Sequence, residues 1–499
     1  MSSSNRIVRS IAVAALAAQS FLACAKNAPD TLTPVDLRTE YLERPIGMDE
    51  PKPRFSWKLE GTAKRQTAYK VVVRSQDRDV VWDSGWVESG ESVQIEYDGK
   101  PLKPFTRYSW SVAVRDENGA ASKPRQARFE TGFMGTPWSA KWIGSDRHSD
   151  ILRPVPEFKG AIRVGGDVAT ARLYVTALGL YKASINGEPV APENVFTPGW
   201  TQYFDRVQYQ AYDVTKLIQP GRINTLSALL SDGWYTGRIS RHWNGNRPTF
   251  GDQALLKAEL HIRLKNGKTQ KLVTDESWEW RESDIKMADI YDGVHKLAWK
   301  TDAKWLKEPP KKPNVTIFDK NVRIDWQSGA FVRRMHKIKP VEIKKMDNGN
   351  WLVDFGQNFA GWERFTLRGA KKGDVITIRH AEMLKDDGTL YTEAMRSARA
   401  TTTYEASDKP TQVYEPEFTF YGFRYIEIAG WKGRLDKNMI EGISVYSDLE
   451  KTGSCQCGVP LLNQFYSCVV WGQRSNFLDV PTDCPQRDER MGWTGDIAL

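Results

Sequence analysis

Histidine and cysteine are scarce in this sequence, and their positions argue against a metal centre. The chain has six histidines, dispersed at positions 148, 242, 261, 295, 336 and 380. Four of the five cysteines fall within thirty residues, but no second close pair or nearby histidine completes a zinc-ligand spacing. These four, Cys455, Cys457, Cys468 and Cys484, allow three disulfide pairings, and the sequence does not choose among them.

Long apolar runs and concentrated basic stretches are also missing. Beyond the N-terminus no segment approaches the twenty apolar residues of a membrane-spanning helix. The net charge is +9 over 499 residues, and the lysines and arginines are scattered rather than interleaved with aromatic residues in a stripe. This distribution argues against nucleic-acid binding. It is compatible with a slight preference for acidic polysaccharides.

The N-terminus, by contrast, has the pattern of an export signal. Arg6 and Arg9 precede the apolar stretch 11–18, and Phe21-Leu22-Ala23 precedes Cys24. Residues 1–24 therefore predict a signal peptide of the bacterial lipoprotein type, with Cys24 as the lipidated residue. Phe21 replaces the usual leucine, so simple cleavage stays open as an alternative. We expect an exported protein, either periplasmic or tethered by lipid at the outer membrane or cell surface.

The length of the chain exceeds what one hydrophobic core serves, and three regions of it predict β-structure. In residues 31–135, Tyr108, Trp110, Val112 and Val114 alternate with smaller or polar residues, which predicts a half-buried strand. A fibronectin-like or immunoglobulin-like sandwich fits this region. Residues 315–450 predict a further β-sandwich after a proline-rich linker at 308–313.

Residues 140–312 predict a jelly-roll domain. Asn186-Gly187 between apolar runs is a strong hairpin signal. Trp200 and Trp234 each follow a glycine, where a ring can stand at the rim as a platform for a sugar. The alternative, which we favour for any one of them, is that these rings close the ends of the jelly roll.

From about residue 455 the apolar period changes from two to 3.6. Leu462, Phe465, Tyr466 and Val469 share one face of a helix. Pro460 suits the first turn of this helix, which should end near Ser475.

The segment after this helix, DVPTDCPQRDERMGWTGD at 479–496, holds the densest chemistry in the chain. Carboxylates beside an indole suit sugar hydrolysis, because one carboxyl group can protonate a glycosidic oxygen while others hold hydroxyls. A solvated network of arginine–carboxylate pairs explains the same spacing equally well. The charged and aromatic residues concerned are Asp483, Arg487, Asp488, Glu489, Arg490, Trp493 and Asp496.

Several strings, taken in order along the chain, resemble the bacterial α-L-rhamnosidases of glycoside hydrolase family 78. The resemblance covers nearly the whole chain after the signal, and the last string is the most specific. The strings are LRTEYLERPIG (37–47), PRFSW (53–57), SDGWYTGR (231–238), DFGQNFAGW (354–362), RHAEML (379–384), FYGFRY (420–425) and DVPTDCPQRDERMGWTGD (479–496).

The resemblance implies a mainly β multidomain fold. A fibronectin-like sandwich would be followed by a jelly-roll domain like carbohydrate-binding module family 67 and a β-sandwich. Residues 455–499 would then form the first helix and first active-site loop of a truncated (α/α)6 six-hairpin catalytic domain. The implied activity is hydrolysis of terminal non-reducing α-L-rhamnose from oligosaccharides, polysaccharides or glycosides, with inversion and no required cofactor.

Site residues follow from the motif. Glu489 resembles the general acid of the family, and Asp483 and Asp496 resemble carboxylates that hold sugar hydroxyls. Three more residues, Arg487, Asp488 and Trp493, are expected to line the same pocket. No residue matches the partner base of the family, so we expect no rhamnoside hydrolysis by this chain alone.

Other functions stay open. The chain is alternatively a non-catalytic rhamnose-binding protein or an inactive gene fragment, or belongs to an (α/α)6 enzyme for another deoxysugar. In relatives the jelly-roll domain can hold rhamnose with calcium, and Glu193 and Asn194 are the candidate pair here. A plain turn before Pro198 is the favoured alternative for these two residues.

Overall fold

The computed structural model describes residues 32–146, 154–239 and 250–495. The chain divides into two compact units, Met1–Thr136 and Pro137–Leu499. The predicted signal peptide, including Cys24, and the predicted site residue Asp496 lie outside the described residues.

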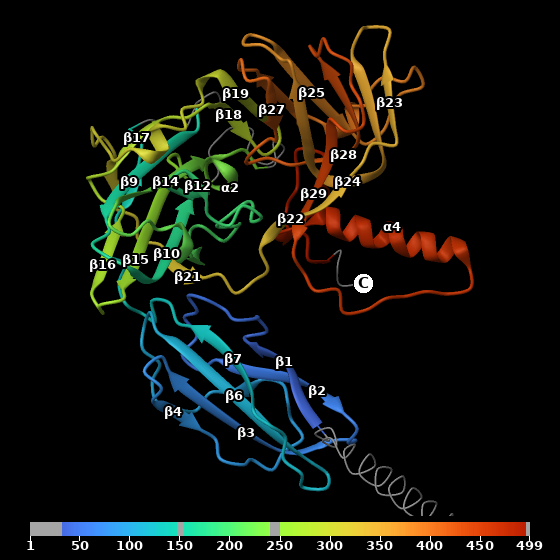
Figure 1. The fold of residues 1–499 in the computed structure, drawn as a ribbon. Helices are drawn as coiled ribbons and strands as arrows, with labels where there is room; N and C mark the ends of the chain where they lie inside the picture. The colour runs from blue at the N-terminus through green and yellow to red at the C-terminus, as the bar shows by residue number, and fades with distance from the viewer. Residues whose placement is uncertain (1–31, 147–153, 240–249, 496–499) are drawn as a thin grey trace, which may run out of the picture. The chain divides into compact units, whose positions relative to one another are not determined.

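The first unit is a sandwich of two antiparallel sheets (Figure 1). Strand β6 buries every second residue along its whole length, as the alternation predicts. The sheets share a core in which the Phe55 and Trp110 ring centroids lie 4.6 Å apart. One sheet contains β1 (Leu32–Thr39), β2 (Arg54–Gly61) and β5 (Ile95–Glu96), and the other β3 (Gln66–Ser75), β4 (Val80–Asp83), β6 (Arg107–Asp116) and β7 (Arg125–Glu130).

The second unit begins with two sheets around one apolar core. The Asn186-Gly187 turn joins β11 to β12 with Ile185 opposite Glu188, as the hairpin signal predicts. The seven-stranded sheet has β8 (Trp142–Gly144), β10 (Val168–Leu178), β13 (Arg206–Asp213), β15 (Leu255–Leu264), β16 (Thr269–Val273), β20 (Thr316–Phe318) and β21 (Arg323–Trp326). The five-stranded sheet has β9 (Pro156–Arg163), β11 (Leu180–Ile185), β12 (Glu188–Pro189), β14 (Ile223–Ser231) and β17 (Glu279–Glu282).

A ten-stranded sheet forms the rest of the β-structure. In β25, Ile376, Ile378 and His380 are buried on one face, as the alternation predicts. The strands are β18 (Ile285–Asp289), β19 (Gly293–Leu297), β22 (Val332–Ile338), β23 (Glu342–Lys345), β24 (Trp351–Arg368), β25 (Val375–Ala381), β26 (Thr401–Glu405), β27 (Thr411–Tyr414), β28 (Tyr421–Ala429) and β29 (Ile440–Ser447).

Strands are exchanged between these two parts of the second unit. Strands β18 and β19 lie within the range predicted for the jelly roll, yet β19 pairs in parallel with β26 of the ten-stranded sheet. In the opposite direction, β20 and β21 follow the predicted linker but pair with β8 and β13. The chain therefore crosses between the two parts more than once, and one large apolar cluster contains residues of both.

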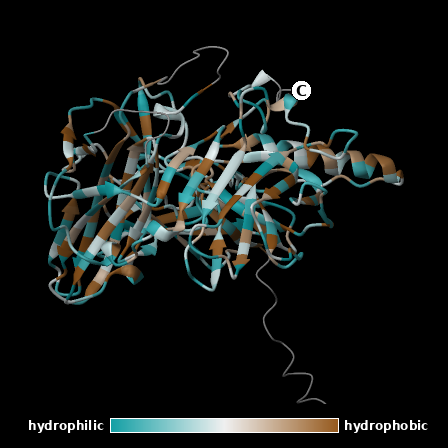
Figure 2. Ribbon diagram, turned by 90° about the horizontal axis from the view of Figure 1, so that it is seen from above, coloured by the Kyte–Doolittle hydropathy of each residue, from teal (hydrophilic) through white to brown (hydrophobic). Residues whose placement is uncertain are grey.

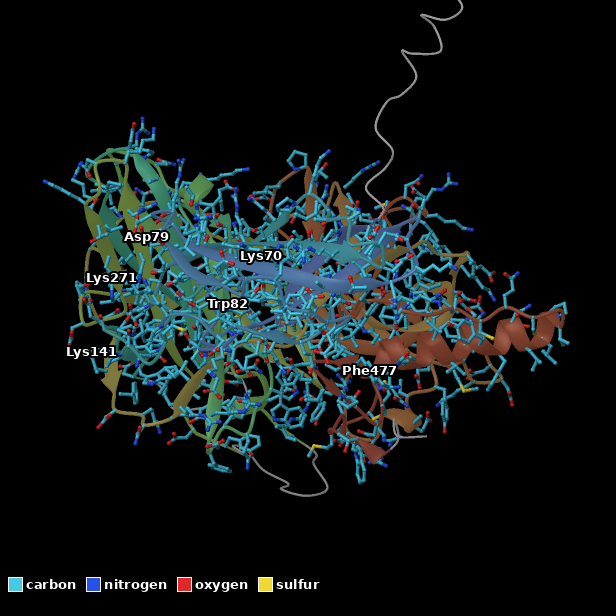
Figure 3. The ribbon with its side chains drawn as sticks, turned by 90° about the horizontal axis from the view of Figure 1, so that it is seen from below. Lys70, Asp79, Trp82, Lys141, Lys271 and Phe477 are labelled. Carbon is cyan, nitrogen blue, oxygen red and sulfur yellow. The ribbon has the colours of Figure 1, made fainter. Side chains whose placement is uncertain are left out.

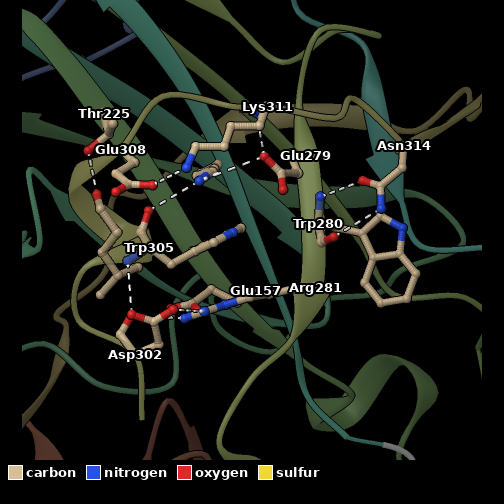
Figure 4. A network of polar contacts seen from close by, with 12 residues as sticks. Glu157, Thr225, Glu279, Trp280, Arg281, Asp302, Trp305, Glu308, Lys311 and Asn314 are labelled. Atoms are coloured by element: carbon tan, nitrogen blue, oxygen red, sulfur yellow. Dashed lines mark hydrogen bonds and ion pairs between the residues drawn. The ribbon is translucent and has the colours of Figure 1, made fainter. Parts of the chain in front are cut away.

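The segment that carries the short helices η2 (Ala298–Lys300) and η3 (Trp305–Lys307) is held against the five-stranded sheet by buried charges (Figure 4). Lys159 Nζ donates to the Trp305 carbonyl at 3.2 Å and lies 4.0 Å from the centre of that ring. Arg281 stacks on the same indole and pairs with Glu157 at 2.8 Å. Burial lowers the pKa of Lys159, although its side chain is satisfied by these contacts.

Of the two glycine-linked tryptophans, Trp234 is buried and Trp200 is partly buried against the same cluster. Trp234 lies in the short helix α2 (Gly233–Thr236), is only 4% exposed, and stacks on Trp200 with centroids 5.7 Å apart. Burial makes the interpretation of Trp234 as a rim platform wrong, and the ring packs in an apolar cluster that also contains residues of the ten-stranded sheet. That these rings close the end of the jelly roll stays a prediction. The remaining short helices are η1 (Thr215–Leu217) and η4 (Glu393–Met395).

The long helix α4 (Pro460–Asn476) begins at the proline and ends one residue beyond Ser475, as predicted (Figure 1). Its predicted apolar face, however, is open to solvent: Leu462, Phe465 and Val469 are each more than half exposed. Figure 2 shows hydrophobic residues along this helix. The C-terminal end of the helix contacts the ten-stranded sheet, where Ser475 Oγ accepts a hydrogen bond from the Ala360 N–H. Phe477, just beyond the end of the helix, is labelled in Figure 3. No helix among the described residues is long and apolar enough to cross a membrane.

Candidate active site

The acidic loop is closed on itself by main-chain and side-chain hydrogen bonds. After α4, the strands β30 (Phe477–Leu478) and β31 (Val480–Pro481) form a tight hairpin around Asp479, whose φ is +71°. Thr482 then pairs with Gly492, and the Met491 N–H donates to Asp483 Oδ1 at 2.9 Å. The closure gathers four of the predicted residues, Asp483, Arg487, Asp488 and Glu489, in one loop.

Arg487 links two of the predicted site carboxylates. Its Nη2 donates to Asp483 Oδ2 and its Nε donates to Glu489 Oε2, both at 2.9 Å. The Asp483 and Glu489 side chains are 11% and 18% exposed, so both are accessible but largely sheltered. The structure thus brings Asp483, Arg487 and Glu489 together. The same contacts form the arginine–carboxylate network that the sequence spacing predicts as the alternative to a sugar site.

A further arginine, Arg396, reaches Glu489 from the ten-stranded-sheet region. It directly follows η4, and its Nη1 donates to Glu489 Oε2 at 2.9 Å. Arg396 could not be identified from the sequence, because it lies in an irregular loop nearly a hundred residues from the motif. A positive φ of +57° at this non-glycine residue is the local sign of its special position, and it is visible only in the structure.

Asp488 points away from the solvent, unlike its neighbours. It is 2% exposed, and Ser397 Oγ donates to its Oδ2. Its Oδ1 has no hydrogen-bond partner among the described residues. A sugar in the exposed part of the loop would not touch this carboxylate, so the placement favours a positioning role over the predicted substrate contact.

Arg490 anchors the loop from below. Its side chain is 1% exposed and donates to the carbonyl oxygens of four residues, Ile290, Phe420, Gln486 and Arg487, at 2.7–3.0 Å. Its guanidinium also lies 4.6 Å from the centre of the Phe420 ring. Burial lowers the pKa of Arg490, and the carbonyl oxygens supply the polar partners that a buried cation requires.

The turn between β18 and β19 supports the same loop. The Tyr291 hydroxyl donates to the Glu489 carbonyl oxygen at 2.6 Å. The turn is shaped by Asp289 Oδ1, which accepts the N–H groups of Tyr291 and Asp292 at 2.9 Å. Arg238, from the SDGWYTGR string, forms buried ion pairs with Asp289 and Asp292. This chain of contacts connects a jelly-roll motif to the main chain of Glu489.

Asp479 ties the start of the loop to the jelly roll. The Trp200 N–H donates to Asp479 Oδ2, and Ser447 Oγ accepts the Asp479 N–H at 3.0 Å. Burial raises the pKa of Asp479 to about 6, and the hydrogen bond from Trp200 only partly offsets this effect.

A pH effect on stability follows from Asp479. Because its folded pKa lies above its unfolded value, the proton stabilises the fold below about pH 4, and this contribution is lost as the pH rises through about 6. Asp479→Asn should remove this loss, which we expect to amount to about 1–2 kcal/mol for a partly solvated group. Chemical denaturation at pH 4.5 and 7.5 measures it. Asp347→Asn, at an exposed turn, is the control, and an unchanged pH dependence in Asp479→Asn would contradict the assignment.

Three further predicted residues, Trp493, Glu193 and Asn194, lie outside the closed loop. Trp493 is 46% exposed, as a platform for a sugar requires. Asn194 Oδ1 accepts from Arg333 Nε at 3.1 Å, and Glu193 is exposed with its carbonyl bound to the Arg334 N–H. The Asn194 oxygen that was proposed as a calcium ligand therefore accepts a hydrogen bond from the Arg333 guanidinium. Among the described residues there is no group of three or more potential metal ligands. Calcium binding at Glu193 and Asn194 stays a prediction.

The four cysteines of the C-terminal region are free thiols. Cys484, inside the acidic loop, is buried, and burial raises the pKa of its thiol to about 12. It is therefore a packing residue at neutral pH rather than a reactive thiolate.

Family models match consecutive parts of the chain. They are the Rha78A-like N-terminal immunoglobulin domain (34–135), the α-L-rhamnosidase N-terminal domain (166–342), the bacterial α-L-rhamnosidase concanavalin-like domain (344–446) and the bacterial α-L-rhamnosidase six-hairpin glycosidase domain (450–499). The last of these places the acidic loop in a glycosidase domain.

Individual relatives agree with these matches. An α-L-rhamnosidase of Formosa agariphila is 34% identical, with 92% of this chain and 52% of the relative aligned. The solved α-L-rhamnosidase of Streptomyces avermitilis, in complex with L-rhamnose, superposes with a TM-score of 0.87 at 29% identity, covering 93% of this chain and 62% of that one. The solved α-L-rhamnosidase of Dictyoglomus thermophilum gives a TM-score of 0.87 at 34% identity, covering 94% and 55%.

The chain thus spans between half and two thirds of the length of these relatives. The matches extend over both compact units and follow the order of the strings found in the sequence. The chain belongs to the bacterial α-L-rhamnosidases of glycoside hydrolase family 78.

Proposed function

We propose that this chain supplies the β domains and the acid half of the active site of an enzyme that hydrolyses terminal α-L-rhamnosides. The observation that carries the proposal is the closed loop in which Arg487 holds Asp483 and Glu489 together. The half-exposed Trp493 follows directly after this loop in the sequence. Glu489 would donate a proton to the glycosidic oxygen, and Asp483 and Arg487 would bind hydroxyl groups of the sugar. The indole of Trp493 would pack on the C–H face of the ring.

The ion pairs of Glu489 constrain this mechanism. In the structure its Oε2 is bound by both Arg396 and Arg487, an arrangement suited to a charged carboxylate. A general acid must instead carry a proton when it meets the substrate. We therefore infer that substrate hydroxyls take over one or both guanidinium groups on binding and free Glu489 to act.

Inversion requires a second carboxylate, which activates a water molecule on the opposite face of the sugar. In inverting glycosidases the two carboxyl groups lie about 6.5–9.5 Å apart. Asp483 is held by Arg487 and by the Met491 N–H and is therefore placed to bind rather than to act as this base. We propose that the base comes from a further part of the six-hairpin domain, the same part that would cover the exposed apolar face of α4.

Two preparations test the proposal. A protein with a complete six-hairpin domain should release nitrophenol from an aryl α-L-rhamnoside, and proton NMR should first detect the β-anomer of rhamnose. The 499-residue chain by itself should release none. Hydrolysis by the chain alone would show that a base lies within it, and initial formation of the α-anomer would contradict inversion.

A further inference from the structure

A cavity of about 420 Å³ lies apart from the acidic loop, where the five-stranded sheet meets the ten-stranded sheet. One wall comes from the β11–β12 hairpin and the segment that follows it, and the opposite wall from β27 and residues 415–418. Cavities that bind small ligands in proteins span about 300–1,000 Å³. The volume is therefore sufficient for a small ligand.

Charged side chains line this cavity, and most are fixed before any ligand arrives. Glu417 lies between Lys182 at 3.1 Å and Lys296 at 3.5 Å. Burial would raise the pKa of Glu417, but the two lysines hold it at about 2, so the carboxylate stays charged. Both carboxylate oxygens of Glu415 accept from Arg334 Nη2, at 2.6 and 2.8 Å, and its Oε2 also accepts from Trp362 Nε1 at 3.0 Å. Arg364 Nε lies 3.5 Å from the other oxygen. Such ion pairs give the cavity a preorganised polar wall.

The balance of charge in the lining is positive. Four cationic residues, Lys182, Lys296, Arg334 and Lys409, line the cavity together with the two carboxylates Glu415 and Glu417. Lys296 is further neutralised by Asp284 at 3.7 Å, outside the cavity. Lys409, which is exposed, has no ion pair among the described residues. A ligand with a negative charge would be attracted to this side of the cavity.

Unused hydrogen-bonding capacity and apolar surface complete the lining. The Tyr414 hydroxyl and Arg334 Nε are buried and have no hydrogen-bond partner among the described residues. Buried polar groups are usually satisfied, so Arg334 Nε, on a residue of the cavity lining, indicates a missing partner. The β11–β12 hairpin side contributes Pro189, Val190 and Pro192, which offer apolar contacts for C–H groups.

From these features we propose that the cavity binds one residue of an acidic sugar, a hexuronate. Its carboxylate would lie near Lys182 and Lys409, its hydroxyl groups would meet Glu417 and the fixed polar wall, and its C–H face would contact the hairpin. The cavity would thus give the protein an accessory glycan site, separate from the loop that carries Glu489.

Calorimetry on the 499-residue chain tests the site without any hydrolysis. D-Glucuronate should bind at least tenfold more tightly than D-glucose or L-rhamnose, and the affinity should fall as salt is raised, since exposed charges are screened. Equal affinities for glucuronate and glucose, or no heat with either, would overturn the proposal and leave a water-filled cavity. Neither result bears on rhamnoside hydrolysis, which depends on a different site.

Two variants locate the binding. Lys182→Met should weaken glucuronate binding at least tenfold, because it removes one cation of the lining. Thr411→Trp, at an exposed position of β27 that lines the cavity, should block it by bulk while leaving the denaturation midpoint close to that of the wild type. Lys344→Met, which removes an exposed charge elsewhere, is the matched control. Wild-type affinity in both Lys182→Met and Thr411→Trp would place the ligand outside this cavity.

Discussion

Glu489→Gln should lower rhamnoside turnover by about 10²–10⁴-fold in a protein with a complete six-hairpin domain. Glutamine keeps the size and the acceptor oxygen that faces Arg396 and Arg487, but it has no proton to give to the leaving oxygen. The loss should be greatest for poor leaving groups such as a second sugar, and smaller for a nitrophenyl rhamnoside, whose leaving oxygen needs less protonation. Steady-state turnover of the two substrates measures the difference.

The control is Glu342→Gln, on an exposed position of β23, which should turn over both substrates at the wild-type rate. Asp488→Asn separates the two neighbouring carboxylates. If the larger loss, with the stronger dependence on the leaving group, appears in Asp488→Asn, then the acid has been assigned to the wrong residue. A smaller loss that is equal for both substrates fits the buried contact of Asp488 with Ser397.

Arg490→Met should destabilise the second unit by about 3–5 kcal/mol, as the loss of one partner from a buried charged contact does. The substitution keeps a long apolar side chain but leaves four carbonyl oxygens without their donor. Because these carbonyls belong to the acidic loop and to the segments beneath it, the loop should open before the rest of the unit. Chemical denaturation reports the first effect, and amide hydrogen exchange over residues 482–493 reports the second.

Arg434→Met is the matched control, because Arg434 is exposed and its loss should change stability by less than about 0.5 kcal/mol. Equal, small effects in Arg434→Met and Arg490→Met would mean that water replaces the guanidinium at little cost. If Arg490→Met lowers global stability strongly but leaves amide hydrogen exchange over residues 482–493 unchanged, then Arg490 stabilises the core and does not hold the acidic loop closed.

Much of the local structure could be predicted from the sequence, because the pattern of side chains and the burial agree. The alternation around Trp110 predicts β6, Asn186-Gly187 predicts the β11–β12 turn, and Pro460 marks the first turn of α4. In each case the signal is contained in a few neighbouring residues. The loop residues Asp483, Arg487 and Glu489 were likewise found, since they lie within one short motif.

Features that depend on distant segments could not be predicted. Arg396 contacts Glu489 across 93 positions of sequence, and the Tyr291 hydroxyl reaches the Glu489 carbonyl across 198. The helical period around Phe465 gives the type of element but not what covers it, and here that face is exposed. Periodicity reports which face of an element is apolar, whereas its partner is decided by the tertiary fold.

The exchange of strands between the jelly roll and the ten-stranded sheet has a consequence for how this protein can be dissected. A single cut near residue 313 would separate β19 from its partner β26, and would separate β20 and β21 from their partners β8 and β13. Each fragment would then expose unpaired sheet edges, which favour aggregation. The jelly roll and the ten-stranded sheet are therefore interlocked and should unfold in one cooperative step. The sandwich of residues 32–136 should be separable as an intact piece, because in the described part of the chain its strands pair with one another and with no strand of the second unit.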